Sequence, residues 1–529
     1  MYKDILKHLF LVGTGVMSIS TTMAKSNAER PNILFCIADD ASYHYFGAAG
    51  CKWVKTPNYD KLAQQGLFFT NCYTPNAKSA PSRACVLTGR NSWQLKEAGN
   101  HITNFPSDIK VFTESLSENG YEVAYTGKGW EPGNPGMKDG KPRELTGTPY
   151  QEMKKKKLTR YISKTDYAAN FSLFLDKRDK DKPFFFWFGS REPHRRYEWK
   201  SGIEKGNMDI SSIDEIPVFW PDNDTIRTDL LDYALEVQEF DKQLGEVISE
   251  LEKRDELDNT LIVVTADNGM PFPRSKANNY ELANHEPLVM MWKNGIKQPG
   301  RNVSEYISFI DFAPTFLDLA GVKEKESGML PITGKSLKCF LDNEVSDKEK
   351  EYRKRLILGR ERDDYGRPNN GGYPIRSIMK DGMMYVWNMK PDRWPAGNPE
   401  TGYMDVDGSP TKTFILQQNR NGNPEYYRYS FAKRPEEELY DLKKDKWCMN
   451  NLANDKKYSK LKKELRKELE KELIKQEDPR MLGNGDVFDN YAFEKENNWN
   501  FWERVVSGEI VEPWKQTGWI NKSDYEPLK

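Results

Sequence analysis

Apolar runs of strand length alternate with helical stretches from residue 31 onward. Buried strands are expected at 32–38, 122–126, 183–189 and 261–266, with a fifth candidate at 287–292. Helices are expected at 57–66, 107–120, 226–254 and 311–320, and the third has apolar residues at three- and four-residue spacing. This alternation predicts an α/β fold, in which helices cover both faces of a large, mostly parallel sheet.

Beyond residue 345 the segments become shorter and richer in Tyr, Pro, Asn and Lys, with a sheet-like piece at 383–389. Leucines at 461, 465, 469 and 473 predict a surface helix that docks through a narrow apolar face. The tail at 481–529 carries Trp499, Trp502, Trp514 and Trp519, and we expect it to pack on the body, with a separate sugar-binding platform as the alternative. The expected parts are an N-terminal domain at 25–345, an α+β subdomain at 346–480 and this aromatic tail.

The first 24 residues are typical of an export signal. Lys3 and Lys7 give a basic start, residues 9–19 are apolar, and Thr22-Met23-Ala24 resembles the pattern before a cleavage site. A membrane anchor is the alternative, but the run is too short to span ~30 Å of hydrocarbon. No other stretch is long and apolar enough to span a membrane, so we expect a periplasmic or secreted protein.

Composition excludes several classes of protein. The 529 residues are 37% apolar and 12% aromatic, which argues against a disordered chain. The formal net charge of −1 gives no general reason to bind nucleic acid. The six cysteines show no zinc-site or disulfide-framework spacing, although Cys72 and Cys85 could pair in an oxidising compartment.

Polar side chains follow several of the expected strands. Asp39-Asp40, Lys128, His194 and Asp267-Asn268 each come after a different one. Ligands of open parallel sheets bind beyond the carboxyl ends of the strands, so these groups are expected to form one site. Three carboxylates and an amide oxygen suit Ca²⁺ or Mg²⁺ better than zinc or copper. With Arg83 added, the pocket fits a bound oxyanion such as sulfate or phosphate.

The most specific motif is Ser79-Ala80-Pro81-Ser82-Arg83, followed by Leu87-Thr88-Gly89-Arg90. By composition it is a turn opening a helix, but it closely resembles the signature of type I sulfatases of the alkaline phosphatase superfamily. The resemblance covers roughly residues 30–455. It includes Pro31-Asn32-Ile33, Thr56-Pro57-Asn58, Gly127-Lys128, Pro193-His194, Thr265-Ala266-Asp267-Asn268-Gly269 and Glu438-Leu439-Tyr440-Asp441-Leu442.

The resemblance implies a role for each matching residue. Ser79 matches the residue converted to Cα-formylglycine, whose hydrated aldehyde is the nucleophile. A serine here implies maturation by an anaerobic bacterial radical enzyme, and therefore a bacterial source. Asp39, Asp40, Asp267 and Asn268 match the calcium ligands, together with the modified Ser79. Arg83 matches the residue that stabilises the formylglycine hydrate, and Lys128 and Lys276 match the cations that bind sulfate. His194 matches the histidine that is the candidate general acid.

A subgroup resemblance points to sulfamidases, the heparan N-sulfatases. It rests on Met270-Pro271-Phe272-Pro273, Lys276, Glu286-Pro287-Leu288 and Tyr373-Pro374-Ile375-Arg376-Ser377. One position departs from the family pattern, because Lys128-Gly129-Trp130 stands where Lys-x-His is usual. Trp130 either packs the pocket wall or stacks on a sugar, and O-sulfate of galactose, N-acetylgalactosamine or glucosamine remains an alternative substrate.

The candidates for sugar recognition are His101, Trp130, His285, Glu361, Arg362, Asp363 and Arg367. Three functions remain open from the sequence. The first is a sulfatase for sulfated oligosaccharides, acting on N- or O-sulfate. The others are a phosphoester or phosphonate hydrolase with the same metal cage, and a noncatalytic binder of sulfated glycans. The intact signature disfavours the second function, and retention of every metal position disfavours the third.

Overall fold

The computed structural model describes residues 30–527, and the expected export signal at 1–24 lies outside this range. A nine-stranded sheet forms the centre of the molecule, in the order β12-β2-β11-β10-β1-β9-β4-β8 with β13 beside β2. Its strands are β1 (Asn32–Ala38), β2 (Leu67–Tyr73), β4 (Glu122–Gly127), β8 (Thr148–Pro149), β9 (Phe184–Gly189), β10 (Thr260–Ala266), β11 (His285–Met291), β12 (Arg301–Val303) and β13 (Ile307–Ser308).

The expected parallel sheet is confirmed, with one reversed strand. β1 lies parallel to β10 and β9, whereas β11 runs antiparallel to both β10 and β2. The apolar run at 287–292 predicted a strand there but not its direction. β2 escaped prediction, because half-buried Thr70 and Asn71 interrupt its apolar run.

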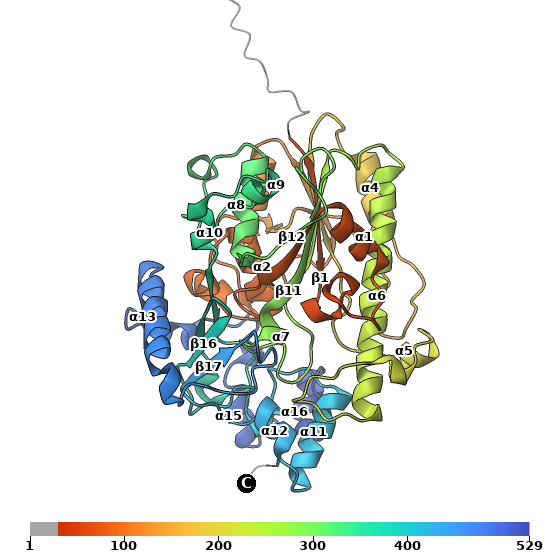
Figure 1. Cartoon of the computed structure of the whole chain (residues 1–529). Coiled ribbons are helices and arrows are strands. Elements are labelled where there is room, and N and C mark those ends of the chain that lie inside the picture. Colours follow the sequence, from red (N-terminus) through yellow and green to blue (C-terminus); the bar gives the residue numbers. More distant parts are fainter. Residues whose placement is uncertain (1–29, 528–529) are drawn as a thin grey trace, which may run out of the picture.

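Alternate residues of the central strands face two separate helical layers (Figure 1). Leu34 and Cys36 of β1 pack toward α1 (Pro57–Gln65), α4 (Tyr167–Lys177) and α6 (Asp224–Glu252). Ile33, Phe35 and Ile37 face the opposite layer. That layer contains α2 (Ser79–Thr88), α3 (Phe112–Glu118), α8 (Phe312–Leu319) and α9 (Lys338–Leu341). Burial on both faces is why these strands lack a polar alternation.

A second, antiparallel sheet lies below the first in Figure 1. Its strands are β14 (Arg355–Arg360), β15 (Ile375–Lys380), β16 (Met383–Asn388) and β17 (Glu437–Asp441). The helix expected from the leucine spacing is α13 (Ser459–Lys475), and it docks as expected. Its Leu465, Leu469 and Leu473 are buried against Ile378 and Tyr385 of this sheet.

The remaining helices connect or cover these two sheets. They are α5 (Ser201–Glu204), α7 (Glu281–Asn284), α10 (Asp347–Tyr352), α11 (Pro410–Arg420), α12 (Glu425–Ser430), α14 (Val487–Asn490), α15 (Phe501–Val506) and α16 (Pro513–Thr517). In the tail, Phe501 and Trp519 pack against Tyr365 of the body. Trp519 also lines one hollow together with Asp39, the residue that follows β1, so the tail lies at the carboxyl end of this strand.

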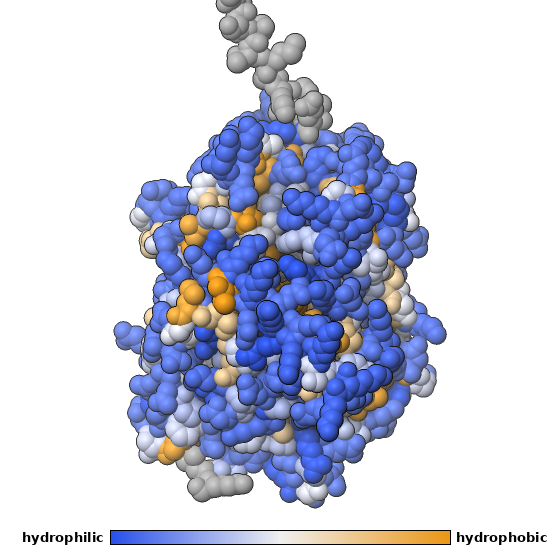
Figure 2. All heavy atoms as spheres, turned by 60° about the vertical axis from the view of Figure 1, so that its left-hand side comes forward, coloured by the Kyte–Doolittle hydropathy of each residue, from blue (hydrophilic) through white to orange (hydrophobic). Residues whose placement is uncertain are grey.

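The outer surface is mainly polar on the face shown in Figure 2, with apolar side chains in small scattered patches. No helix within residues 30–527 combines the length and the apolar character that a membrane crossing needs. All six cysteines lie in the described range and are free thiols, so the pairing of Cys72 with Cys85 is not formed.

The docking of α13 can be tested by truncating one buried leucine. Replacing Leu469 with Ala leaves a cavity among apolar side chains, so we expect a loss of ~2–5 kcal/mol in the free energy of unfolding. The matched control is Ile474→Ala on the same helix, because the Ile474 side chain is 53% exposed. That change should stay within ~0.5 kcal/mol. Urea denaturation of both variants measures the difference, and equal effects would contradict this packing.

Candidate active site

The register of two parallel strands brings a group of carboxylates together. Ala38 of β1 lies opposite Ala266 of β10, so Asp39 and Asp267 leave the sheet side by side. The backbone then turns at Asp40, whose φ is 73°, a conformation that Asp tolerates better than most residues. Oxygens of Asp39, Asp40 and Asp267 come within 4.8 Å of one another, and all three residues are buried.

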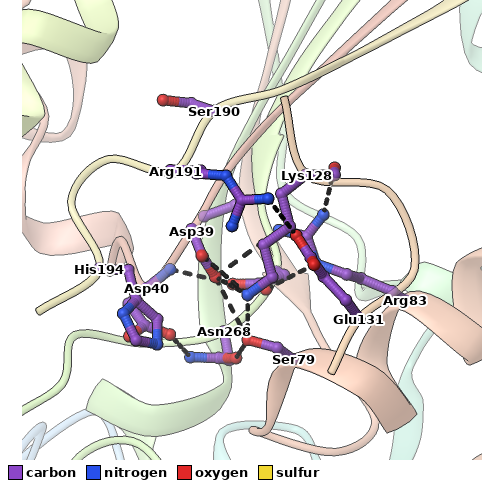
Figure 3. Close-up of polar contacts among 12 residues, drawn as sticks. Asp39, Asp40, Ser79, Arg83, Lys128, Glu131, Ser190, Arg191, His194 and Asn268 are labelled. Carbon is purple, nitrogen blue, oxygen red and sulfur yellow. Dashed lines mark hydrogen bonds and ion pairs between the residues drawn. The ribbon is translucent and has the colours of Figure 1, made fainter. Parts of the chain in front are cut away.

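Ser79 lies at the N-terminus of α2 and points at this carboxylate group (Figure 3). Its Oγ is 3.2 Å from Oδ1 of Asp39 and 3.4 Å from Oδ1 of Asn268. Four residues along the helix, Arg83 Nε donates to Asp267 at 2.8 Å. The Arg83 guanidinium also donates to the carbonyl oxygens of Lys128 and Gly129. Arg83 thus connects α2, the carboxylate group and the segment after β4.

Two lysines and a histidine also border the same group. Lys128 Nζ lies 2.7 Å from both oxygens of Asp39 and 3.2 Å from Ser79 Oγ. Lys276 Nζ lies 2.7 Å from Asp40. His194 is half-buried, with Nε2 at 3.7 Å from Asp40. All the catalytic and metal-site residues expected from the sequence therefore converge here.

Charge pairing determines which of these groups are ionised. Burial alone would raise the pKa of Asp39, but Lys128, His194, Arg83 and Lys276 together hold it well below its usual value. Burial would also lower the pKa of Lys276, yet Asp40, Asp407 and Asp39 raise it above the usual lysine value. Asp39 is therefore a carboxylate and Lys276 an ammonium at neutral pH.

The donor set fits a hard cation. Asp39, Asp40 and Asp267 supply carboxylate oxygens, and Asn268 supplies an amide oxygen that already points toward Ser79. An all-oxygen set of this kind favours Ca²⁺ or Mg²⁺, as the sequence predicts. Asn268 is held in place because its Nδ2 donates to Asp40 at 2.8 Å.

A cavity of about 440 Å³ opens above Ser79. The expected residues Asp39, Ser79, Lys128, His194 and Lys276 line it. Its other lining side chains come from loops after several strands and from the C-terminal part of the chain, and include Lys78, His101, Glu131, Tyr161, Arg191, Arg195, Asp364, Asp407 and Trp519. Arg191 pairs with Glu131 at 2.8 Å across the cavity rim, as Figure 3 shows.

Of the residues proposed to recognise sugar, His101 lines the cavity. Its Nδ1 is 3.3 Å from Oδ1 of Asp364, whose other oxygen accepts from Lys78 Nζ at 2.8 Å. Burial alone would raise the pKa of Asp364, but Lys78 and His101 hold it well below its usual value. The Lys78–Asp364–His101 group forms one charged wall of the cavity.

The neighbouring candidates Arg362 and Asp363 were assigned wrongly. The Arg362 guanidinium lies over the Phe493 ring and donates to the carbonyl oxygens of Asp489 and Tyr491. Asp363 accepts from Arg360. Glu361 and Arg367 are likewise buried in ion pairs, with Arg376 and Asp405 respectively. These four side chains are buried in the interior, and of residues 361–364 only Asp364 lines the cavity.

His285 and Trp130 also lie outside the cavity lining. The His285 ring stacks on Tyr43 and Tyr73, while its Nε2 donates to the Thr70 carbonyl. Trp130 is 6% exposed, and its Nε1 donates to the Ala80 carbonyl at 2.9 Å. Trp130 therefore supports the first turn of α2 from behind, which corrects its assignment as a sugar-binding residue.

Several cavity residues were missed by the sequence analysis. Lys78 directly precedes the Ser79 motif, and Arg191 lies in the segment after β9, so the position of each was a usable signal. Asp407 lies in an irregular segment far along the chain, and no local pattern distinguishes it from a surface residue. Trp519 was named as part of the aromatic tail, but its place in the cavity lining was not predicted. Burial alone would raise the pKa of Asp407, but the nearby Lys276 and Lys78 lower it below its usual value.

Comparison with known proteins agrees with this geometry. The sulfatase family model matches residues 31–322. An ulvan-active sulfatase of Formosa agariphila is 28% identical over 454 residues, 84% of this chain and 80% of that protein. The human N-sulphoglucosamine sulphohydrolase is 26% identical over 471 residues, 82% of this chain and 88% of its own. An N-acetylglucosamine-6-O-sulfatase of Bacteroides thetaiotaomicron is 29% identical over 416 residues, 60% of this chain and 72% of its own.

A solved structure shares the fold. It is a protein in complex with its substrate D-glucosamine-2-N,6-O-disulfate, with a TM-score of 0.60 and 22% identity. The match covers 88% of this chain and 100% of that one. The family model spans more than half of the sequence, including the Ser79 motif and the carboxylate group. This chain belongs to the sulfatase family, a family of hydrolases of sulfate esters or sulfamates.

Proposed function

We propose that the protein releases N-linked sulfate from a glucosamine unit of a sulfated glycan. The carrying observation is the cavity itself, in which Ser79 faces Lys128 and Lys276 above a buried carboxylate group. The segment after Asn268, which resembles that of sulfamidases, favours N-sulfoglucosamine as the substrate. It supplies Lys276 to the cavity, and its Pro271 carbonyl accepts a hydrogen bond from Arg195. The similarity to the human N-sulphoglucosamine sulphohydrolase adds further support.

O-sulfated glucosamine is the second candidate substrate. Trp130 occupies the position of the family histidine and is turned away from the cavity, so one expected sulfate contact is missing. The similarity to an N-acetylglucosamine-6-O-sulfatase points the same way. Both candidates place a sulfated glucosamine in the cavity and differ in which sulfate lies over Ser79.

Ser79 is the proposed nucleophile position after conversion to Cα-formylglycine. The hydrated aldehyde supplies a geminal diol oxygen in place of the serine hydroxyl. The N-terminus of α2 favours negative charge beside residue 79, where a sulfate oxygen would lie. Lys128 and Lys276 would donate to the sulfate oxygens, and Arg83 holds Asp267 of the carboxylate group in place through a bond of 2.8 Å.

Calcium is the proposed cation, held by Asp39, Asp40, Asp267, Asn268 and residue 79. It would supply positive charge that polarises sulfate and stabilises an ionised nucleophile. The protein orients the ligands through bonds among themselves, since Asp40 N donates to Asp267 at 2.9 Å.

His194 is the proposed general acid for the departing sugar nitrogen or oxygen. Its Nδ1 lies 2.6 Å from the carbonyl oxygen of Arg195, which can only accept, so Nδ1 carries a proton. Nε2 therefore faces the cavity side near Asp40 and is the nitrogen that exchanges the catalytic proton. Maturation by a radical enzyme and export to the periplasm or medium complete the proposal.

The substrate is tested by sulfate release from defined monosaccharides, with protein co-produced with a maturation enzyme. We expect release from N-sulfoglucosamine in preference to glucosamine-6-O-sulfate, galactose sulfate and N-acetylgalactosamine sulfate. The same chain produced without the maturation enzyme, and Ser79→Ala, should each lose at least ~10⁴-fold in turnover. Release only from an O-sulfated sugar would replace the N-sulfate proposal by the second candidate. Full turnover by protein that retains unconverted Ser79 would contradict the assignment of formylglycine as the nucleophile.

Calcium binding is tested by thermal unfolding with chelator or with added Ca²⁺. Binding only to the folded state at a hundred times Kd stabilises by about 2.7 kcal/mol, so the melting temperature should rise. Asp267→Asn should weaken this response, because it removes one of three clustered carboxylates. Asp347→Asn is the control, since Asp347 is exposed on α10. An unchanged melting temperature in wild type, or an undiminished response in Asp267→Asn, would argue against this site.

The role of His194 is tested by varying the leaving group. His194→Ala should lower kcat ~10²–10⁴-fold on a sugar sulfate or sulfamate, whose leaving group needs a proton. On 4-nitrophenyl sulfate the loss should be much smaller, because nitrophenolate leaves without one. Equal losses on both substrates would assign His194 to binding rather than to proton transfer.

A further inference from the structure

A second hollow, which we call the outer groove, adjoins the active-site cavity. It measures about 920 Å³ and shares Tyr161 and Arg195 with the cavity wall. The tail forms the rim between them, because Trp519 lines the cavity while Gly518 and Ile520 line the outer groove. α6, α11 and α16, which contribute its walls, meet at the lower end of the molecule in Figure 1.

Exposed aromatic rings line the outer groove. Trp199 is 45% exposed and Tyr161 is 39% exposed, although both are large apolar side chains that proteins usually bury. Two guanidinium groups flank the Tyr161 ring, with Arg160 Cζ at 5.2 Å and Arg196 Cζ at 5.9 Å from its centroid. Exposed rings of this kind provide flat surfaces on which a sugar face can pack.

The free charge of the outer groove is positive. Within residues 30–527, Arg160, Arg196 and Lys522 form no ion pair with a carboxylate at 4 Å or less, although all three are exposed. The carboxylates beside them are already engaged. Asp229 binds Arg195 through two hydrogen bonds, and Glu198 pairs with Lys205 at 2.7 Å. Asp232 accepts from the backbone N–H groups of Lys200 and Gly202.

We propose that the outer groove binds the following sugars of a sulfated chain whose terminal sugar lies in the cavity. At about 440 Å³ the cavity is near the small end of ligand pockets, ~300–1,000 Å³, so a longer chain has to continue outside it. The shared wall at Tyr161 and Arg195 is the direct exit, and the unpaired cations match sulfate or carboxylate groups along the chain. This inference rests on the proposed function and specifies an oligosaccharide substrate.

The experiment compares kcat/KM on a sulfated glucosamine monosaccharide with kcat/KM on a heparin-derived tetrasaccharide ending in the same sugar. N-sulfo and 6-O-sulfo forms are both used. Wild type should favour the tetrasaccharide at least roughly tenfold, equivalent to about 1.4 kcal/mol. Trp199→Ala and the double variant Arg160→Ala/Arg196→Ala should each lose most of that preference and keep the monosaccharide rate within roughly twofold. Lys325→Ala, an exposed cation outside both hollows, is the control.

The outcomes separate the two proposals. Equal kcat/KM for both lengths in wild type, or an undiminished preference in both groove variants, would overturn the outer groove while leaving the sulfatase assignment intact. A loss on the monosaccharide as large as on the tetrasaccharide would also overturn it, because the variants would then act on the cavity. Cleavage of neither length in either sulfated form would contradict the proposed substrate and the inference that rests on it.

Discussion

The structure depends on holding three carboxylates together in a buried place. Like charges at such distances repel strongly in an environment of low polarity, and burying them without partners is unfavourable. Arg83, Lys128 and Lys276 supply the opposing charges, and each comes from a different segment. Folding of α2, the segment after β4 and the loop after β10 is therefore coupled at one point. The same arrangement leaves residue 79 with cations on its cavity side.

The sheet fixes this point more firmly than any loop could. Asp39 and Asp267 are adjacent because β1 and β10 are parallel and in register, and Lys128 follows β4, whose end lies level with that of β9. This is why the chemistry at the strand ends was predictable from the sequence. Apolar runs locate the buried strands, and polar residues directly after them must meet at one edge of the sheet. The Ser79 motif then identified the family, which residue spacing alone could not do.

The rest of the cavity was not predictable, for physical reasons that differ between residues. Arg362 and Asp363 looked like solvated recognition residues, but the chain folds them inward onto carbonyl groups and Arg360. Charge on a loop does not reveal whether its partner lies in water, in a ligand or in the protein. Asp407 and Trp519 reach the cavity through irregular segments whose position depends on tertiary packing. Trp130 was recognised as a departure, but only the structure shows its Nε1 bound to the Ala80 carbonyl.

The residues that would act on sulfate and the residues that would recognise the sugar come from different parts of the fold. Asp39, Asp267 and Lys128 come directly after strands of the large sheet, and residue 79 lies in the first turn of α2, where packing on both sides fixes them. His194 and Lys276 lie farther along the loops that follow β9 and β10. Groups that would choose the sugar come from the loops around 161, 191 and 364 and from the tail around 519. Those segments pack on the sheet rather than within it, so their sequence can change without moving Asp39 or Asp267. Related proteins can therefore share the carboxylate group and the nucleophile position while differing in the glycan that they accept. The residues that determine the substrate are to be sought in these loops and in the tail.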